Sequence, residues 1–151
     1  PEAERGDVLS PGSQTLVVGD LQPGYDALNA ATREIDLVWF GCPHAGLDEM
    51  SRIAGLLEGR RVSSELWVTT ARGIREEAKA EGLVERIEAS GGRVVADMCV
   101  VVAPMEELGL HTLATSSAKG AWYVPSHAGL LVRYGTVEQC IEAAMTGIWP
   151  G

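Results

Sequence analysis

The stretch Asp36-Leu-Val-Trp-Phe-Gly41 decides the fold, because it is a short and nearly continuous apolar run that ends in glycine. Similar runs rich in apolar and β-branched residues occupy positions 15–19, 65–70, 93–97, 111–115 and 130–134. Apolar runs without alternating polar residues are typical of parallel strands that helices cover on both faces. We therefore expect β-strands at all of these positions.

Helical patterns separate the expected strands. One follows Cys42 and ends near Gly59, a second runs from about 72 to 90, and the last begins at Thr136, which forms a capping-box pattern with Gln139. Two of these helices carry apolar residues at spacings of three and four: Leu47, Met50, Ala54 and Leu57 in the first, and Val137, Cys140, Ile141, Ala144 and Ile148 in the last. The alternation predicts a three-layer α/β domain with a mostly parallel sheet.

Length and composition predict the domain organisation. The chain has 151 residues, of which 46% are hydrophobic and 22% charged, as expected for one folded domain. Residues 1–14 combine charges with Pro11, Gly12 and Ser13, which is typical of a linker or lead-in segment. We expect a single α/β domain over residues 15–151. Because the chain starts at Pro1 instead of Met, we interpret it as a piece of a larger protein.

Charge and hydropathy argue against two classes of partner. The formal net charge of −9 opposes binding to nucleic acids, which attract clustered Lys and Arg. No apolar run approaches the roughly 20 residues that a membrane-spanning helix needs, and the N-terminus lacks the basic-then-apolar order of a secretory signal. We therefore expect a cytoplasmic protein that binds neither nucleic acid nor membrane.

Residues capable of chemistry follow three of the expected strands. Cys42-Pro-His44 follows the run 36–41, Asp97-Met-Cys99 follows the run that begins at Arg93, and Thr115-Ser-Ser-Ala-Lys119 follows the run that begins at His111. Ligands of open parallel sheets gather at the carboxyl ends of the strands, where loops and helix N-termini present free backbone N–H groups. We therefore expect all three segments at one edge of the sheet.

The three cysteines have different expected roles. Cys42 and Cys99 are distant in sequence, but two thiolates at one edge would suit a soft metal or an iron–sulfur cluster. The alternative stays open that each is a small buried apolar side chain. Cys140 lies in the apolar stripe of the last helix, which indicates packing. His44 is either a metal ligand, a general acid or an orienting group, or it caps or solvates the next helix.

The run of residues 115–119 predicts an anion site. Hydroxyls of Thr115, Ser116 and Ser117 and the ammonium of Lys119 stand where a strand gives way to a helix, and the helix dipole there favours an anion such as a substrate carboxylate. The alternative is a helix-capping cluster beside a solvated lysine.

Taken in order, these motifs resemble the aconitase X family, which includes cis-3-hydroxy-L-proline dehydratases and phosphomevalonate dehydratases. The resemblance implies an aconitase-like domain of a hydro-lyase that removes water from a small hydroxy carboxylic acid. It rests on Gly41-Cys-Pro-His-Ala45 before an acidic helix start, Leu66-Trp-Val-Thr-Thr70, Asp97-Met-Cys-Val-Val-Val-Ala-Pro104, Thr115-Ser-Ser-Ala-Lys119 with Ala121-Trp-Tyr123, and Val137-Glu-Gln-Cys140.

The resemblance also implies roles for particular residues. Cys42 and Cys99 would hold an iron–sulfur cluster or a mononuclear iron whose third ligand comes from outside this chain. The iron would act as a Lewis acid on the substrate hydroxyl while a base removes the neighbouring proton, and His44 is the candidate catalytic residue. The substrate carboxylate would lie against Thr115, Ser116, Ser117 and Lys119.

By the same resemblance, the active site needs parts that lie outside these residues. The remainder of the catalytic region and a swivelling domain or small subunit would complete it, so we expect the isolated chain to be inactive. The sequence departs from the family at Ser116, Gly120 and Trp122, where members usually carry other residues. These departures leave the substrate open and favour, as a rival, a non-catalytic binding module that has lost its metal.

Overall fold

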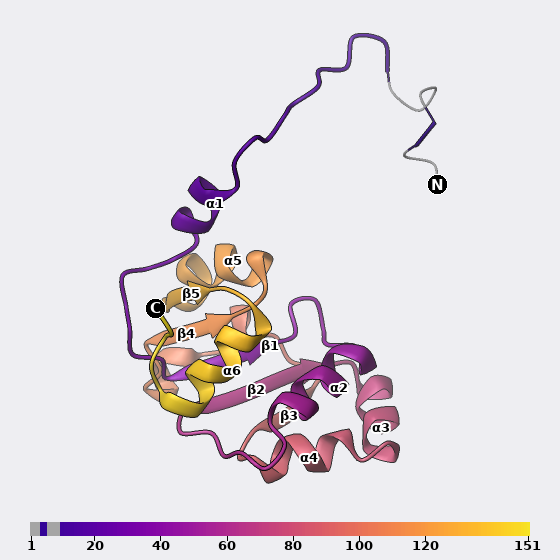
Figure 1. Ribbon diagram of the computed structural model, residues 1–151, viewed down its shortest axis with the longest axis vertical. Helices are drawn as coiled ribbons and strands as arrows, with labels where there is room; N and C mark the ends of the chain where they lie inside the picture. The colour runs from indigo at the N-terminus through magenta and orange to yellow at the C-terminus, as the bar shows by residue number, and fades with distance from the viewer. Residues whose placement is uncertain (1–3, 6–9) are drawn as a thin grey trace.

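The computed structural model describes residues 4–5 and 10–151, which build one parallel sheet covered by helices on both faces (Figure 1). The sheet has five strands in the order β3-β2-β1-β4-β5, and every neighbouring pair is parallel. The strands are β1 (Leu37–Phe40), β2 (Glu65–Thr70), β3 (Arg93–Ala96), β4 (Thr112–Thr115) and β5 (Leu131–Tyr134). The predicted three-layer α/β architecture is confirmed.

Helices form the two outer layers. Helices α2 (Leu47–Leu56), α4 (Leu83–Ala89) and α6 (Val137–Thr146) pack on one face, with α3 (Arg72–Ala80) beside α2 and α4. Helix α5 (Ala118–Ala128) covers the other face together with the short 3-10 helices η3 (Val100–Val102) and η4 (Met105–Leu108). Helix α1 (Gln22–Ala27) lies beside the edge strand β5 (Figure 1).

The sheet divides the apolar core into two clusters. Along β1, Val38 and Phe40 face the α2-α4-α6 side, whereas Leu37 and Trp39 face the α5 side. All four side chains are buried, because helices cover both faces of this central strand. The nearly continuous apolar run of residues 37–40 is thus the sequence signature of a strand that packs on both sides.

Two predicted elements differ from the structure. The strand expected at residues 15–19 does not form in this structure: these residues lie outside the sheet of this domain and are exposed. The helix expected over 72–90 is two helices, since Gly82 takes a left-handed conformation with φ of 72° and ends the first of them. The lead-in segment expected at residues 1–14 lies partly outside the described residues.

The last helix matches its sequence signature with one exception. Thr136 accepts a hydrogen bond from the N–H of Gln139 (3.2 Å), and the Gln139 side chain accepts one from the N–H of Thr136 (2.9 Å), so the capping box is confirmed. Gly147 ends the helix in a left-handed conformation, which leaves Ile148 beyond it. Within residues 4–5 and 10–151, none of the helices is both long and apolar enough to cross a membrane.

Candidate active site

The carboxyl ends of β1, β3 and β4 lie at one edge of the sheet, because all the strands run in the same direction. We call this the carboxyl edge, and its three loops the Cys42 loop (residues 41–46), the Cys99 loop (97–99) and the Ser117 loop (115–119). Strand β1 lies between β2 and β4, and β2 separates it from β3. The expectation that these segments share an edge is therefore confirmed.

The Cys42 loop turns sharply away from β1 and is held by the end of β2. Gly41 has φ of 123°, and a Cβ at this position would overlap the carbonyl and hydroxyl oxygens of Thr69. The N–H of Ala45 donates to the carbonyl of Thr69 (2.9 Å), and the hydroxyl of Thr70 donates to the carbonyl of Ala45 (2.5 Å). Only glycine at position 41 permits the backbone to approach the end of β2 this closely. The contacts with β2 therefore fix the position of Cys42.

The Cys99 loop begins at Asp97, whose backbone is left-handed with φ of 56°. Its N–H donates to the carbonyl of Thr70 (2.9 Å). Its carboxylate accepts hydrogen bonds from the backbone N–H of Arg72 (3.0 Å) and from the guanidinium Nε of Arg72 (3.0 Å). Asp tolerates this conformation better than most residues, and the bonds fix the direction in which the chain continues into Met98 and Cys99. Thr70 thus joins both cysteine loops.

Both thiols lie on the same face of the sheet. Cys42 and Cys99 are half-buried and pack against the apolar cluster under α5. The two loops also touch directly, because Nε2 of His44 lies 3.2 Å from the carbonyl oxygen of Met98. His44 itself is exposed. Topology and contacts thus place Cys42, His44 and Cys99 in two touching loops at one edge of the sheet, while their chemical roles stay predictions.

Cys140 lies in the opposite cluster. It is fully buried among the side chains of the α2-α4-α6 face, and burial raises the pKa of its thiol to about 12. A thiol in this position is a small apolar group rather than a metal ligand. The packing role predicted for Cys140 is confirmed.

In the Ser117 loop, the hydroxyls of Thr115 and Ser117 already form hydrogen bonds with backbone groups. Thr115 is buried, and its hydroxyl accepts a hydrogen bond from the N–H of Ser117 (3.2 Å). The hydroxyl of Ser117 caps α5 by accepting from the N–H of Gly120 (2.9 Å) and donates to the carbonyl of Cys42 (2.5 Å). The helix-capping alternative therefore describes Ser117 correctly. Ser116 is half-buried and Lys119 exposed, and their binding of an anion stays a prediction.

Gly120 has a packing explanation. A Cβ at this position would lie 3.0 Å from the ring of Trp39 and 3.3 Å from the side chain of Ser117. Glycine therefore lets the first turn of α5 approach β1 closely. The small residue at this position thus accommodates a large aromatic side chain in the central strand.

Sequence reasoning missed several residues that shape the carboxyl edge. Thr69, Thr70 and Arg72 act through partners more than 20 positions away in the chain, so no local pattern marks them. Glu49 was also missed. It lies in the first turn of α2, directly after the Cys42 loop, where burial raises the pKa of its carboxyl group and Arg52 opposes the shift. The acidic pair Asp48-Glu49 at the start of a helix was the available signal.

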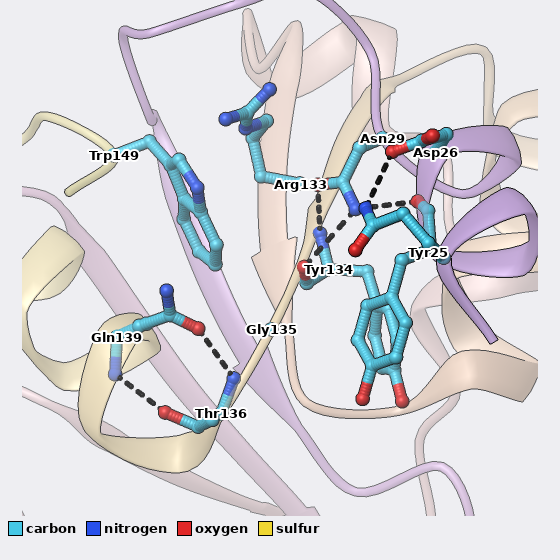
Figure 2. Close-up of a pocket in the computed structure, with 10 residues that line it drawn as sticks. Tyr25, Asp26, Asn29, Arg133, Tyr134, Gly135, Thr136, Gln139 and Trp149 are labelled. Carbon is cyan, nitrogen blue, oxygen red and sulfur yellow. Dashed lines mark hydrogen bonds between the residues drawn. The ribbon is translucent and has the colours of Figure 1, made fainter. Parts of the chain in front are cut away.

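A hollow of about 430 Å³ lies beside the end of β5, between α1 and α6 (Figure 2). Several of its polar groups form hydrogen bonds that hold the structure, whereas the buried Nε of Arg133 has no hydrogen-bond partner among the described residues. The side chain of Asn29 accepts from the N–H of Tyr134 (2.9 Å) and donates to its carbonyl (3.2 Å), as a neighbouring strand would. Arg133 donates to the carbonyl of Ala30 (2.7 Å), and Tyr25 stacks on Tyr134 at 5.2 Å. We interpret this hollow as the joint that attaches α1 to the edge strand.

The donor set of the carboxyl edge fits part of a metal site. Two half-buried thiols and a neighbouring imidazole are ligands that soft and borderline metals accept. Among the residues that the structure describes, no three His, Cys, Asp or Glu side chains converge as a full metal site. Metal binding by Cys42 and Cys99 therefore stays a prediction.

Comparisons with known proteins identify the family of the chain. The sequence model described as "Aconitase X third domain" matches residues 35–146. The phosphomevalonate dehydratase large subunit of Methanothermobacter thermautotrophicus is 43% identical over 127 residues, which cover 84% of this chain and 31% of that protein. The cis-3-hydroxy-L-proline dehydratase of Pseudomonas aeruginosa is 37% identical over 142 residues, which cover 86% of this chain and 24% of that protein.

A solved structure gives the same result. The holo-form of aconitase X from Thermococcus kodakaraensis superposes with a TM-score of 0.75 at 35% identity, over 82% of this chain and 32% of that one. The chain thus spans about a third or less of the length of the relatives named here. Because the family match covers the whole sheet and its helices, the chain belongs to the aconitase X family, as the third domain of its members.

Proposed function

We propose that this chain is the third domain of a hydro-lyase that removes water from a small hydroxy carboxylic acid. The single observation that carries the proposal is the position of Cys42 and Cys99 on one face of the carboxyl edge, with their loops in contact. The relatives named dehydratases support the reaction class. Both cis-3-hydroxy-L-proline and phosphomevalonate stand as candidate substrates, because relatives of either name match the chain.

Cys42 and Cys99 would hold an iron–sulfur cluster or a mononuclear iron together with a third ligand from another part of the protein. Half-burial suits this role, because it shields the ligands from water while one side stays open to the partner ligand. When bound, the iron would supply Lewis-acid polarisation of the substrate hydroxyl. This chain's own contribution is to fix the two sulfur atoms through the loops that Thr69 and Thr70 anchor.

Ser116 and Lys119 would bind the substrate carboxylate at the start of α5. Lys119 is exposed and carries the positive charge, and the N-terminus of the helix favours an anion at the same place. Thr115 and Ser117 would act by shaping this loop, because their hydroxyls already bond to backbone atoms. His44, exposed beside the Cys99 loop, would carry the proton that the reaction moves.

The rest of the active site would come from outside this chain. The relatives are about three to four times longer than the part that matches, which supports a site completed by the remainder of the catalytic region and by a swivelling domain or small subunit. We propose that the isolated chain is inactive for this reason.

The decisive experiment replaces cysteines one at a time in the full-length enzyme. Iron per protein is measured after anaerobic reconstitution, and turnover is measured with both candidate substrates. We expect Cys42→Ser and Cys99→Ser to lose iron and activity, because each removes a thiolate ligand. Cys140→Ala is the matched control and should keep both, since Cys140 lies in the opposite cluster. Unchanged iron in the Cys42 and Cys99 variants would contradict the proposal and favour the metal-free binding module.

A further inference from the structure

Residues 14–21 form an arm that leads away from the body of the domain (Figure 1). The arm exposes large apolar side chains. The exposed fractions are 88% for Leu16, 86% for Val17, 72% for Val18 and 68% for Leu21. Single exposed apolar residues are ordinary, but a contiguous group of this size usually marks an interaction surface. The arm therefore requires a partner that covers it.

The composition of the arm indicates which kind of partner. Thr15-Leu-Val-Val-Gly19 is rich in β-branched residues, which favour strands. Successive side chains of a strand point to opposite faces, so Leu16 and Val18 would share one face and Val17 would occupy the other. Because both faces are apolar, the arm has the pattern of a strand that is covered on both sides, like β1 of this domain.

The sheet of this domain is not the natural partner. The arm joins α1, and α1 is fixed beside β5 through the stacking of Tyr25 on Tyr134. At that edge the N–H of Ala30 already donates to the carbonyl of Val132 (2.8 Å), and Asn29 bonds to Tyr134. The other edge strand, β3, lies at the far end of the sheet. A strand partner for the arm must therefore come from elsewhere.

We propose that in the complete enzyme the arm is a β-strand within the sheet of another domain of the same polypeptide. The matched region is described as a third domain and begins at residue 35, which places the arm ahead of it in the chain. The phosphomevalonate dehydratase large subunit of Methanosarcina mazei aligns with 97% of this chain while the match covers 36% of its own length, so its similarity extends into the arm. The inference does not depend on the metal or on the reaction.

Hydrogen exchange of the full-length protein tests the proposal. The backbone N–H groups of residues 15–19 are bonded in a sheet if the proposal is right, and we expect exchange at least about 100-fold slower than in an unstructured peptide. Exchange at the unstructured rate would overturn it. Protection that disappears on dilution would also overturn it, because the partner would then be a second copy of the chain.

Charge substitutions in the full-length protein test the two-faced burial. We expect Leu16→Asp and Val17→Asp each to abolish the protection of the arm, because both faces are covered. Gln14→Asp is the matched control: it adds the same charge one residue before the run 15–19, outside the proposed strand, and should leave the protection unchanged. Loss in the Leu16 variant with full protection in the Val17 variant would overturn the two-sided burial. If a variant fails to fold, exchange in the unsubstituted protein still decides.

Discussion

Single residues with left-handed backbones set the geometry of the carboxyl edge. Gly41 turns the chain from β1 into the Cys42 loop, and Asp97 turns it from β3 into the Cys99 loop. Glycine adopts such a conformation without cost, whereas any other residue needs support from its surroundings. At Asp97 the support comes from Arg72, which bonds to the carboxylate through its backbone N–H and its guanidinium.

Replacement of Asp97 tests this support. Asp97→Ala removes both acceptors for Arg72 and the tolerance for a left-handed backbone, and we expect a loss of about 1–3 kcal/mol in the free energy of unfolding together with reduced iron content. Asp97→Asn keeps the tolerance and one acceptor, so it should recover much of both. Urea unfolding and iron analysis of the full-length enzyme measure the effects.

A control for Asp97 is available at the start of β3, the strand that Asp97 follows. Arg93 forms an ion pair with Glu65 (3.4 Å) at the other end of β3, away from the carboxyl edge. Arg93→Gln should leave the iron content unchanged, because exposed ion pairs contribute little. Equal loss of iron in the Arg93 and Asp97 variants would show that the effect is general destabilisation and not positioning of the Cys99 loop.

At the scale of single residues, the sequence predicted the residues that follow the strands. It missed the residues whose hydrogen bonds hold the following loops in place. Cys42, Cys99 and Ser117 could be placed because the end of a parallel strand is visible in the apolar pattern. Thr70 could not, because its bonds to Ala45 and Asp97 depend on which strands become neighbours. The capping role of Ser117 required knowledge of where α5 begins.

At the scale of elements, β1 and β4 are joined at their amino ends by Asp36. Its carboxylate accepts hydrogen bonds from the N–H groups of His111 (2.9 Å) and Thr112 (3.0 Å), and its own N–H donates to the hydroxyl of Thr112 (2.8 Å). Partial burial by itself would raise the pKa of Asp36, but the hydrogen bonds outweigh it and hold the pKa below its usual value.

The lowered pKa of Asp36 predicts a pH-dependent contribution to stability. The unfolded carboxyl titrates at about 3.9, so the contribution is complete above that pH and is lost as the pH falls through the lower pKa of the folded state. We expect Asp36→Asn to be less stable than the unsubstituted protein at pH 7, and the difference to shrink below about pH 4. Urea unfolding of both proteins at each pH measures it, and a constant difference would contradict the assignment.

The elements differ in how far the sequence determined them. The start of helix α6 was predictable because Thr136 and Gln139 form a capping box locally, whereas its end at Gly147 was missed and the apolar stripe was continued to Ile148. The helix break at Gly82 was not, since a glycine inside a helical pattern is often tolerated. The run of residues 15–19 has the composition of a strand, but a strand also needs a partner, and partners lie outside the information in a local window.

At the scale of the whole molecule, the sheet separates the cysteines. Cys42 and Cys99 are half-buried on the α5 face, while Cys140 is fully buried on the other face with a pKa of about 12. Burial thus keeps the Cys140 thiol protonated near neutral pH, and the thiolate is the reactive form. Burial and the raised pKa thus both lower the reactivity of the Cys140 thiol.

Thiol labelling of the metal-free full-length enzyme measures this separation. We expect Cys42 and Cys99 to react with a maleimide in the folded protein, and Cys140 to react only when the domain unfolds. Mass spectrometry of the labelled peptides identifies each site, and a urea series gives the transition. Labelling of Cys140 at the same rate as Cys42 under native conditions would contradict the arrangement of the two clusters.

The anchoring of the Cys42 loop has a consequence for how such enzymes diversify. Within the Cys42 loop, the hydrogen bonds to β2 and to Ser117 use backbone atoms of Gly41, Cys42 and Ala45. Their partners are the hydroxyls of Thr69, Thr70 and Ser117. Side chains at positions 42 and 44 can therefore be exchanged without releasing the loop. A lineage can therefore change the side-chain chemistry that it presents at these two positions while it keeps the same scaffold.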